Sequence, residues 1–470
     1  MKCKKGEIVI PEWISCRTYL YGTKDSRTYI SDERKHNCVL LEGLSSDMWQ
    51  MLLDGTDEAE FAAWAERNGV TEQTEPFISE LSESGLIRCE NGEPYGGAAY
   101  GSFGDGALTD GEAKFVEEMQ LWLHAHGFMY SLFIELTYRC DLKCVHCYNP
   151  KNMPSVELDL DKCKKAIDDA YELGCFRVVF SGGESTMHSR FIELVRYARS
   201  KRMSVEVFTN GQRLSENEEL YGELLGAYPY RVSVSLYGMS PEVHERVTAV
   251  KGSFEKTYSL LRRLRRDNVN VQIKDFLLNV NCRDCIAVKD AANAMGAASV
   301  ADISLIPTIE GDKKTFGYML GDDDLFRLYT DPESPLYVGT DFKPSDREKR
   351  KSDTPCLGGF TGLCITPSGN VTVCVSLPLS VGDLERASLK DIWQAAAAED
   401  PESKLCEWRK VRISDFNECY NEDHCAFCTF CPGMGYLENG YLKKSDVLCK
   451  QAKIKMKAYR YLRERSAKRD

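Results

Sequence analysis

Three cysteines lie within eight residues of this chain, at Cys140, Cys144 and Cys147, and their C-x3-C-x2-C spacing limits what the segment can form. A [4Fe–4S] cluster normally takes four Cys thiolates, so a three-Cys loop predicts a cubane with one iron open to an outside ligand. The apolar run Ser131–Leu136 predicts a strand, which places the loop at that strand's carboxyl end. A redox loop or a zinc loop is the alternative for the triplet taken alone.

Extended and helical patterns alternate after the triplet. Strands are expected, in addition to the one before Cys140, at Arg177–Ser181, Ser204–Phe208, Arg231–Leu236, Val269–Leu277 and Ile303–Ile306. In Asp159–Leu173 the apolar residues follow helical spacing, and Cys163 shares their face, so we expect a core side chain there. Six β–α units predict a parallel sheet, and parallel barrels carry their active sites at the carboxyl ends of the strands.

Residues of ligand-binding types follow several of these strands. Gly182 and Gly183 let the backbone approach a bound group, and Glu184 carries a carboxylate that can accept hydrogen bonds from an ammonium group. Asn210 and Ser235 lie at the ends of the third and fourth expected strands, as Gly182 to Glu184 lie at the end of the second. Alone, Gly-Gly-Glu would be only a turn, so its meaning depends on its place one β–α unit after the triplet.

This order of motifs resembles the radical S-adenosylmethionine (SAM) superfamily. The resemblance implies an α/β fold, a partial (β/α)6 TIM-like barrel. It also implies that the cluster held by Cys140, Cys144 and Cys147 is the catalytic one, with a free iron that chelates the amino and carboxylate groups of SAM. Reductive cleavage of SAM would then give a 5′-deoxyadenosyl radical that abstracts hydrogen from a substrate.

The same resemblance implies a set of SAM-binding residues: Gly182, Gly183, Glu184, Asn210, Ser235, Arg246 and Ile306. The Gly-Gly-Glu turn would receive the amino group, and Asn210 and Ser235 lie in segments similar to those that hold the ribose and carboxylate. Arg246 would pair with the SAM carboxylate unless it is an exposed helical arginine. Ile306 would contact adenine unless it belongs to the core. His146 replaces an aromatic residue usual before the third cysteine, and its ring can still stack on adenine.

Cysteine usage and the amino-terminal segment bear on the compartment. The chain has 20 Cys, and no apolar run of sufficient length for a signal peptide follows Met1-Lys2-Cys3-Lys4-Lys5-Gly6. The sequence contains no run of about 18 apolar residues, so we expect no membrane-spanning helix. In a reducing cytoplasm clustered cysteines serve as metal ligands, so we expect a cytoplasmic protein with no membrane contact.

Nine cysteines lie in the last quarter of the chain, and the eight other than Cys406 are enough for two closed four-Cys clusters. The run from Cys356 to Gly369-x4-Cys374 and the later group ending Cys431-Pro432-Gly433 resemble the SPASM extension of the superfamily. That resemblance implies one auxiliary [4Fe–4S] cluster on Cys356, Cys364, Cys374 and Cys431, and another on Cys419, Cys425, Cys428 and Cys449. The usual C-x2-C-x5-C-x3-C run reads C-x5-C-x2-C-x2-C here, and two structural zinc sites are the alternative.

The other cysteines receive a plainer interpretation. Cys282 and Cys285 form a C-x2-C at the expected start of a helix, where a redox pair or an extra ligand set is the alternative to core packing. Buried small hydrophobic residues are expected at Cys3, Cys16, Cys38, Cys89, Cys175 and Cys406.

The first ninety residues predict a separate α+β unit. Thr28–Ile30 and Cys38–Leu41 suggest a β-hairpin, followed by helices at Ser45–Leu53, Glu58–Asn68 and Glu75–Gly85. This pattern resembles the winged-helix (PqqD-like) peptide-recognition domain of ribosomal peptide biosynthesis, in which a leader peptide adds a strand to the hairpin edge. Winged helices often bind DNA, but the formal net charge of −12 and the absence of a basic stripe in this region argue against nucleic acid.

These parts predict four segments: residues 1–90 for peptide recognition, 91–125 for a Gly-rich linker and connecting helix, 126–345 for the barrel and 346–470 for the SPASM domain. The linker has no G-x4-G-K-[ST] phosphate loop, and Lys443–Asp470 is expected to form a solvated helix.

The combination resembles sactipeptide and ranthipeptide synthases, which install Cys thioether crosslinks in a precursor peptide. It implies a peptide-modifying oxidoreductase with SAM, three [4Fe–4S] clusters, a Cys-bearing precursor with a leader, and an electron donor such as flavodoxin or ferredoxin. A maturase making carbon–carbon crosslinks or formylglycine would share these motifs. An iron–sulfur electron carrier and a cluster-containing DNA-binding regulator are the alternatives from other classes.

Overall fold

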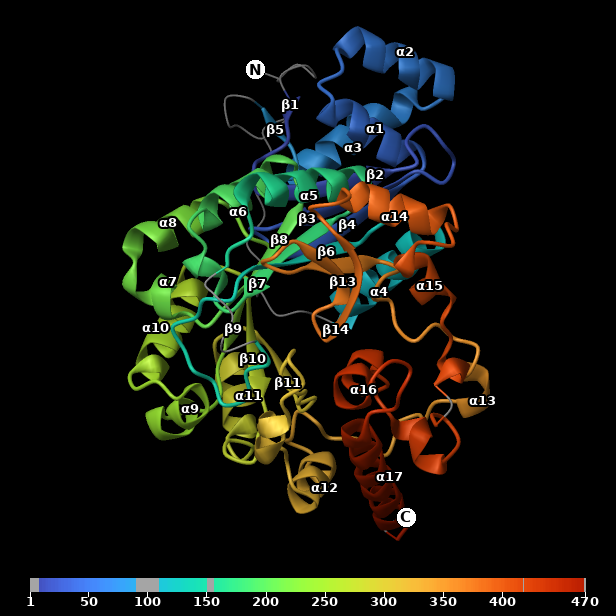
Figure 1. Cartoon of the computed structure of the whole chain (residues 1–470). Coiled ribbons are helices and arrows are strands. Elements are labelled where there is room, and N and C mark those ends of the chain that lie inside the picture. Colours follow the sequence, from blue (N-terminus) through green and yellow to red (C-terminus); the bar gives the residue numbers. More distant parts are fainter. Residues whose placement is uncertain (1–7, 90–109, 150–155, 417, 469–470) are drawn as a thin grey trace.

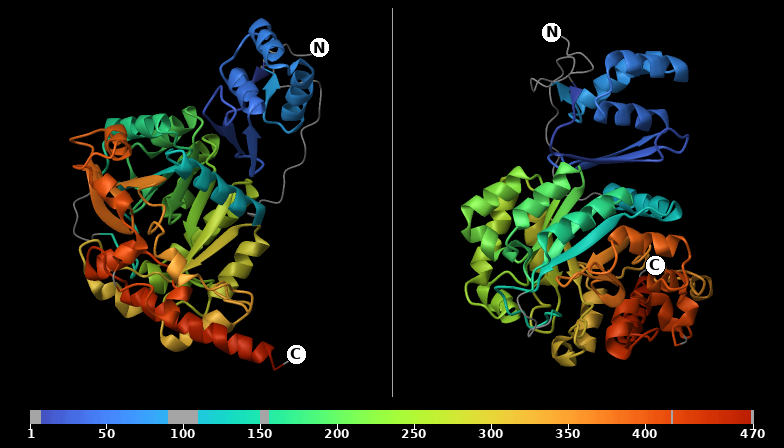
Figure 2. Two further views of the ribbon diagram at one scale, coloured as in Figure 1. Left: turned by 90° about the vertical axis from the view of Figure 1, so that its right-hand side faces the viewer. Right: turned by 45° about the horizontal axis from the view of Figure 1, so that its top comes forward.

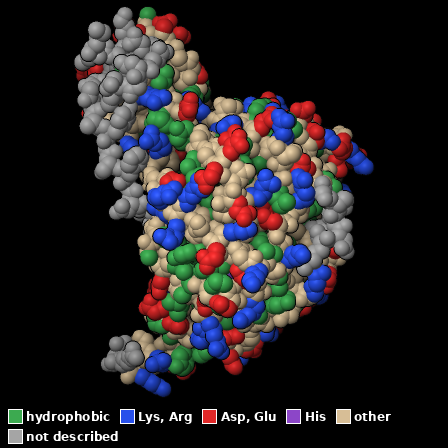
Figure 3. Space-filling view, turned by 90° about the vertical axis from the view of Figure 1, so that its left-hand side faces the viewer, with side chains coloured by type: hydrophobic (Ala, Val, Ile, Leu, Met, Phe, Trp, Pro, Cys, Tyr) green, Lys and Arg blue, Asp and Glu red, His purple; other side chains and the backbone are tan. Residues whose placement is uncertain are grey.

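The computed structural model describes residues 8–89, 110–149, 156–416 and 418–468. Figure 1 shows a small N-terminal α+β module, a central sheet with helices around it, and a C-terminal module beside the sheet. Figure 3 shows that acidic and basic side chains are interspersed over the face that carries the barrel helices. The expected Gly-rich linker lies mostly in residues 90–109, outside the described residues.

Six parallel strands form the barrel in chain order, as expected: β6 (Ser131–Thr137), β7 (Arg177–Gly182), β8 (Ser204–Thr209), β9 (Arg231–Ser235), β10 (Val271–Phe276) and β11 (Ala298–Asp302). The expected position of the last strand, Ile303–Ile306, was wrong. Residues Ala298–Asp302 pair with β10 instead, in a register that runs from Gln272 opposite Ala298 to Phe276 opposite Asp302. The strand then ends where the Asp302 carboxylate accepts a hydrogen bond from the Ser304 amide. Pairing with a neighbour, rather than local apolar character, sets the position of this edge strand.

Helices connect the strands: α5 (Leu160–Glu172), α6 (Phe191–Ser200), α7 (Gln212–Glu216), α8 (Glu218–Gly226), α9 (Pro241–Thr248), α10 (Ser253–Arg266), α11 (Cys285–Ala294) and α12 (Asp322–Thr330), with short 3-10 turns η3 (Ser185–Met187) and η4 (Lys313–Tyr318). The expected helix after Asp159 is α5, which the Asp159 carboxylate caps by accepting from the amides of Asp161 and Lys162. Cys163 lies on the buried face of α5, in the barrel core.

The N-terminal module pairs three antiparallel strands with three helices: β2 (Ile14–Tyr19), β3 (Arg27–Asp32), β4 (Asn37–Glu42), α1 (Leu44–Leu53), α2 (Glu58–Asn68) and α3 (Thr71–Glu83). Two short strands, β1 (Ile8–Val9) and β5 (Arg88–Cys89), also pair. The hairpin and helices match the expectation, whereas β2 was not anticipated and α3 starts four residues early, with Pro76 inside it. Cys89 is buried, as expected, and it is also disulfide-bonded, which the sequence did not indicate.

The N-terminal module rests on the outer side of the barrel, as both views in Figure 2 show. Arg202 donates to the carbonyls of Ile10 and Pro11, and Tyr19 donates through its hydroxyl to the Gly174 carbonyl. Helix α4 (Asp110–Ala125) joins this interface, where Met119 and Leu123 pack with Tyr19 in a small aromatic-rich cluster.

The C-terminal module extends the barrel sheet. Strand β12 (Gly362–Ile365) pairs in parallel with β6, and the antiparallel strands β13 (Asn370–Cys374) and β14 (Leu377–Asp383) complete a nine-stranded sheet. The helices of this module are α13 (Arg347–Arg350), α14 (Leu389–Ala397), α15 (Lys404–Lys410), α16 (Pro432–Asn439) and α17 (Asp446–Ser466), with turns η5 (Ile413–Asp415) and η6 (Asp423–Phe427).

Helix α17 was expected to be solvated, but one of its faces is buried. Its buried residues include Val447, Leu448 and Ile454, which pack against the ends of the barrel connections, and only its opposite face is exposed. Across the described residues, we find no helix that combines the length and the apolar character needed to cross a bilayer.

Candidate active site

The loop that carries Cys140, Cys144 and Cys147 leaves the carboxyl end of β6 beside the end of β7. The Gly183 amide donates to the Thr137 carbonyl at 2.7 Å, and the Glu184 amide donates to the Arg139 carbonyl at 2.8 Å. A Cβ at Gly182 would overlap the Thr137 carbonyl oxygen, and one at Gly183 would overlap those of Tyr138 and Arg139. Both positions therefore need glycine, because the two backbones meet directly before Cys140.

Glu184 is almost fully buried and joins the ends of two strands, β7 and β8. One carboxylate oxygen accepts from the Thr186 amide at 3.1 Å and from the hydroxyls of Thr186 at 2.6 Å and Thr209 at 2.8 Å. The other accepts from the Asn210 amide at 2.7 Å. Burial raises the pKa of this carboxyl and these hydrogen bonds oppose the rise. The carboxylate thus fixes the Gly-Gly-Glu turn against the end of β8.

Asn210 reaches the cysteine loop itself. Its side-chain nitrogen lies 3.6 Å from the Cys140 sulfur and donates to the Asp141 carboxylate at 2.6 Å. The far side of the loop is held by helix α9, because the amides of Lys143 and Val145 donate to the carbonyls of Thr248 and Val247. The structure therefore brings together the triplet, the Gly-Gly-Glu turn and Asn210.

The other predicted SAM-binding residues lie on or after other elements of the barrel, namely β9, α9 and β11. Ser235 is half-buried at the end of β9, whereas Arg246 is exposed on α9 and donates to the Val280 carbonyl at 3.3 Å. Ile306 is 8% exposed and packs with Met434 and Leu448 of the C-terminal module.

His146 stacks on an aromatic ring of the barrel. Its imidazole lies 5.0 Å from the Phe276 ring at an interplanar angle of 13° and meets the Tyr237 ring edge-on. Burial lowers the pKa of His146 to about 4, so the ring is neutral at neutral pH, and its Nδ1 atom has no hydrogen-bond partner among the described residues. The ring is thus available for stacking as a neutral aromatic group.

A buried acid beside the loop escaped the sequence interpretation. Glu135, on β6, accepts from the Tyr148 hydroxyl at 3.1 Å and from the Tyr138 hydroxyl at 3.4 Å. Burial raises its pKa to about 7, an effect that the two tyrosines partly oppose. Its signal in the sequence is a single charged residue within the otherwise apolar run Ser131–Leu136.

The first C-terminal cysteine set, Cys356, Cys364, Cys374 and Cys431, lies where β12 and β13 meet the barrel sheet. Burial, the main cause, raises the pKa of Cys374 to about 12, and neighbouring Cys356 and Cys431 raise it further. Burial also raises the pKa of Cys364, and Glu135 and then Cys374 add to the rise. Close packing joins these segments, because Gly358 lies beside the Cys356 sulfur and the Val373 side chain, and Gly433 lies against the Ser376 carbonyl.

The second C-terminal set, Cys419, Cys425, Cys428 and Cys449, lies around η6 and the start of α17. Burial raises the pKa of Cys428 to about 12, and Cys449, Cys425 and Cys419 each add to the rise. All eight C-terminal thiols are free. No three His, Cys, Asp or Glu side chains in the described ranges form a group that could hold a single metal ion as it stands. The donor type nevertheless suits iron–sulfur clusters, whose usual protein ligands are Cys thiolates.

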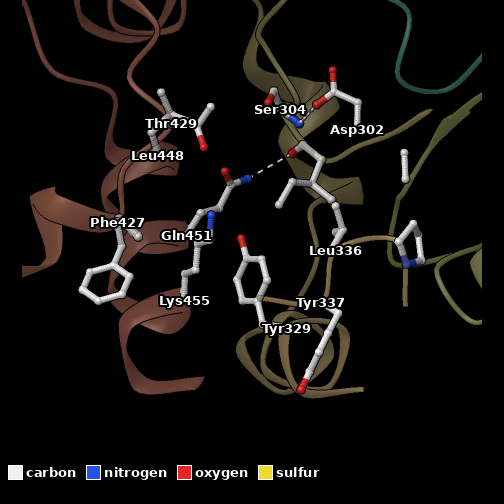
Figure 4. Close-up of a pocket in the computed structure, with 14 residues that line it drawn as sticks. Asp302, Ser304, Tyr329, Leu336, Tyr337, Phe427, Thr429, Leu448, Gln451 and Lys455 are labelled. Carbon is white, nitrogen blue, oxygen red and sulfur yellow. Dashed lines mark hydrogen bonds between the residues drawn. The ribbon is translucent and has the colours of Figure 1, made fainter. Parts of the chain in front are cut away.

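A cavity of about 350 Å³ separates the end of β11 from the second cysteine set. Figure 4 shows Gln451 and Lys455 of α17 on one side, Asp302 and Ser304 on the other, and Tyr329 between them. The Gln451 amide donates to the Ile303 carbonyl at 3.0 Å and ties the two modules together. None of the predicted SAM-binding residues lines this cavity.

Comparisons with known proteins agree with this arrangement. Residues 134–281 match the radical SAM superfamily, and residues 356–432 match the SPASM iron–sulfur cluster-binding domain. The chain therefore contains a radical SAM domain followed by a SPASM domain and is an enzyme, and these two domains imply SAM and iron–sulfur clusters as its cofactors.

Three relatives illustrate the range of that class. The AdoMet-dependent heme synthase of Methanosarcina barkeri is 27% identical over 310 residues, which cover 59% of this chain and 88% of the relative. The antilisterial bacteriocin subtilosin biosynthesis protein AlbA of Bacillus subtilis is 27% identical over 332 residues, 68% of this chain and 70% of AlbA. The structure of Streptococcus suis SuiB bound to its precursor peptide SuiA has a TM-score of 0.57 at 14% identity, covering 94% of this chain and 99% of SuiB.

Proposed function

We propose that this enzyme modifies a ribosomally synthesised precursor peptide and forms Cys thioether crosslinks of the sactionine or ranthionine type. The observation that carries this proposal is the joining of three features in one chain. They are a SAM-type cysteine loop braced by Glu184 and Asn210, two further sets of four thiols, and a separate N-terminal module with an open strand edge.

The extent of the similarities favours a peptide over a small molecule. The fold of SuiB, crystallised with its precursor peptide, covers 94% of this chain. AlbA, named for the biosynthesis of a bacteriocin, covers 68%. A fold shared over nearly the whole chain includes the N-terminal module, which a small substrate would not require.

The N-terminal module offers an edge for a leader peptide. Strand β2 faces the barrel, where the Cys16 amide donates to the Arg202 carbonyl at 3.0 Å. Strand β4 is the other edge of the three-stranded sheet, and all of its residues are at least partly exposed. A leader in extended conformation would add to β4, with backbone hydrogen bonds providing affinity.

The barrel residues have defined tasks in this proposal. Cys140, Cys144 and Cys147 would hold the cluster, and the fixed backbone at Gly182 and Gly183 would meet the SAM amino group. Glu184, whose carboxylate is already satisfied, holds that turn in place. When bound, the cluster and SAM supply the 5′-deoxyadenosyl radical that removes a hydrogen atom from the peptide.

Thioether formation also requires the loss of an electron and a proton. A peptide carbon radical that bonds to a Cys sulfur releases the thiol proton and one electron, which returns the electron used to cleave SAM. The first C-terminal cysteine set lies against β6 and would hold an auxiliary cluster that accepts this electron. With the second set, the cysteines account for three clusters, so we expect about 12 iron atoms per chain.

Anaerobic incubation of the reduced enzyme with SAM tests the enzyme activity. We expect 5′-deoxyadenosine from the wild-type protein and none from Cys144→Ala, whose C-terminal iron should remain. Cys163→Ala, a core cysteine on α5, is the matched control and should retain cleavage. Wild-type protein that forms no 5′-deoxyadenosine would reject this proposal.

Mass spectrometry of a leader-bearing, Cys-containing precursor tests the product. Each thioether removes two hydrogen atoms and one thiol that reacts with iodoacetamide. Loss of two hydrogens with every thiol still reactive would instead indicate a carbon–carbon crosslink.

A further inference from the structure

The two C-terminal cysteine sets have different charged neighbours. The first set lies against β6, whose single charged residue is the acid Glu135. Beside the second set, Lys444 forms an ion pair with Glu418, and Lys453 lies one helical turn after Cys449 on α17. The second set therefore lies beside a helix that carries basic side chains.

That helix, α17, is rich in basic residues. It contains seven Lys or Arg and two acidic residues, in a chain whose formal net charge is −12. Lys453, Lys457 and Arg460 are exposed and are spaced by four and three residues, so they form one stripe on the solvent face. No ion pair joins Lys453 or Lys457 to any acid in the described part of the chain, and Arg460 lies 4.0 Å from Asp423.

The stripe lies directly above candidate cluster ligands. Cys449 is in the first turn of α17, one helical turn before Lys453, so both side chains lie on the same face. The turn η6, which carries Cys425, packs against α17. Figures 1 and 2 show α17 along the border of the C-terminal module, with its last turns projecting from the body.

Other partners of a basic helix suit this geometry less well. Insertion into a membrane surface requires a free apolar face, but Val447, Leu448, Ile454 and Ala458 are buried against the rest of the protein. Nucleic acid would be attracted to the charge, but such a partner has no need of a metal cluster one turn beneath it.

We propose that Lys453, Lys457 and Arg460 form the docking surface for a small acidic electron-carrier protein that exchanges electrons with the cluster held by Cys419, Cys425, Cys428 and Cys449. This inference rests on the proposed function. The carrier loses one electron as the cluster gains one, and the reverse transfer returns it, with no bond made or broken. Opposite charges on the two surfaces steer the encounter and set its orientation.

Binding of an acidic flavodoxin to the anaerobically purified holoenzyme tests the proposal. The probe is the oxidised flavodoxin, and its FMN fluorescence anisotropy reports binding without turnover. We expect the double variant Lys453→Glu/Lys457→Glu to weaken binding at least about tenfold at low salt, and added salt to weaken wild-type binding similarly.

A charge-matched control separates this site from general electrostatics. Arg262→Glu/Arg266→Glu reverses two exposed cations four residues apart on α10 and changes the net charge equally. We expect this control to bind flavodoxin like the wild type. Equal binding by all three proteins, equal weakening in both double variants, or tighter binding of a short duplex DNA than of flavodoxin would overturn the proposal.

SAM cleavage with two reductants distinguishes this inference from the proposed function. With dithionite, which needs no docking, both double variants should cleave SAM at the wild-type rate. With reduced flavodoxin, only Lys453→Glu/Lys457→Glu should be slower, again by about tenfold. A wild-type enzyme inactive with dithionite would refute the proposed function, whereas normal flavodoxin-driven cleavage by the α17 variant would refute only the docking surface.

Discussion

The N-terminal and C-terminal modules are attached to the barrel in different ways. The N-terminal module has a core of its own, which includes Ile14, Trp49, Phe61 and Ile78. It touches the barrel through side chains, a small aromatic cluster and the backbone hydrogen bond from Cys16 to Arg202. The C-terminal module adds three strands to the barrel sheet and shares its core. A unit with its own core can be gained or lost with little effect on its neighbour, whereas a shared sheet makes the barrel depend on both parts.

The difference also matches the proposed tasks. Peptide recognition requires affinity for a flexible leader, and a separable module provides this without altering the chemistry. A cluster that exchanges electrons with the barrel site must keep a fixed position, and pairing of β12 with β6 gives it one. Cys364 on β12 lies opposite Phe133, two residues before Glu135 on the strand that leads into Cys140.

Removing residues 352–470 should have the largest effect, because it tests whether the barrel needs the C-terminal module. Leu132 and Ile134 of β6 are fully buried, and the truncation would open the edge of β6 and remove Leu363, Ile365 and other members of the shared core. We expect an aggregated product with no cooperative unfolding transition, measured by soluble yield and circular dichroism. A soluble, cooperatively folded barrel would contradict the dependence inferred here.

Deleting Met1–Gly104 should have a smaller and more specific effect. Helix α4 remains, so Met119 and Leu123 still cover Tyr130 and Phe176. The deleted module provides binding energy remote from the reaction, so we expect the apparent KM for a leader-bearing precursor to rise at least about tenfold. SAM cleavage without peptide should change little. Processing of the precursor with an unchanged KM would contradict the peptide-recognition assignment.

A single glycine in the C-terminal module tests how tightly the shared part is packed. A Cβ at Gly433, two residues after Cys431, would overlap the Ser376 carbonyl oxygen, two residues after Cys374. We expect Gly433→Ala to lower the free energy of unfolding by about 2–4 kcal/mol and to reduce the iron content. Gly222→Ala on α8 meets no atom within 4 Å and should be neutral or stabilising by up to about 1 kcal/mol. Equal stability of the two variants would show that the close contact between Gly433 and the Ser376 carbonyl tolerates a methyl group.

The order of the barrel strands followed from the sequence because each is a local apolar run that pairs with the next one along the chain. Its edge did not. Residues Ala298–Asp302 have little apolar character, and only pairing with β10 makes them a strand. Likewise, no local pattern indicates that Gly362–Ile365 joins the far edge of the barrel, because its partner β6 lies more than 200 residues earlier.

Some features of the site could likewise be predicted from the sequence, and others could not. The positions of the triplet, the Gly-Gly-Glu turn and Asn210 could be predicted, since each follows a strand in a parallel sheet. The bracing role of the Glu184 carboxylate could not, because its partners Thr186 and Thr209 become neighbours only when two strand ends meet. The basic stripe on α17 was visible as charge, but its place above Cys449 depends on which face of the helix is buried.

The interface of the N-terminal module allows a last, smaller test through pH. Glu33 is fully buried there, 3.7 Å from Arg199, and also accepts from the hydroxyls of Ser15 and Ser31. Burial raises its pKa from 4.5 to about 7, although Arg199 and the serines oppose the rise. Since the folded state holds this proton more tightly than the unfolded state, the stabilisation by Glu33 is complete below pH 4.5 and is lost as the pH rises towards 7.

Urea unfolding of the full chain at several pH values measures this contribution. The free energy of unfolding of the wild type, relative to Glu33→Gln, should fall by up to about 3 kcal/mol between pH 5 and 8. Glu42→Gln, which alters an exposed carboxylate on the neighbouring strand, serves as the control and should track the wild type. A constant difference between wild type and Glu33→Gln would mean that Glu33 stays ionised throughout. In that case its ion pair with Arg199, rather than burial, governs how the N-terminal module is held.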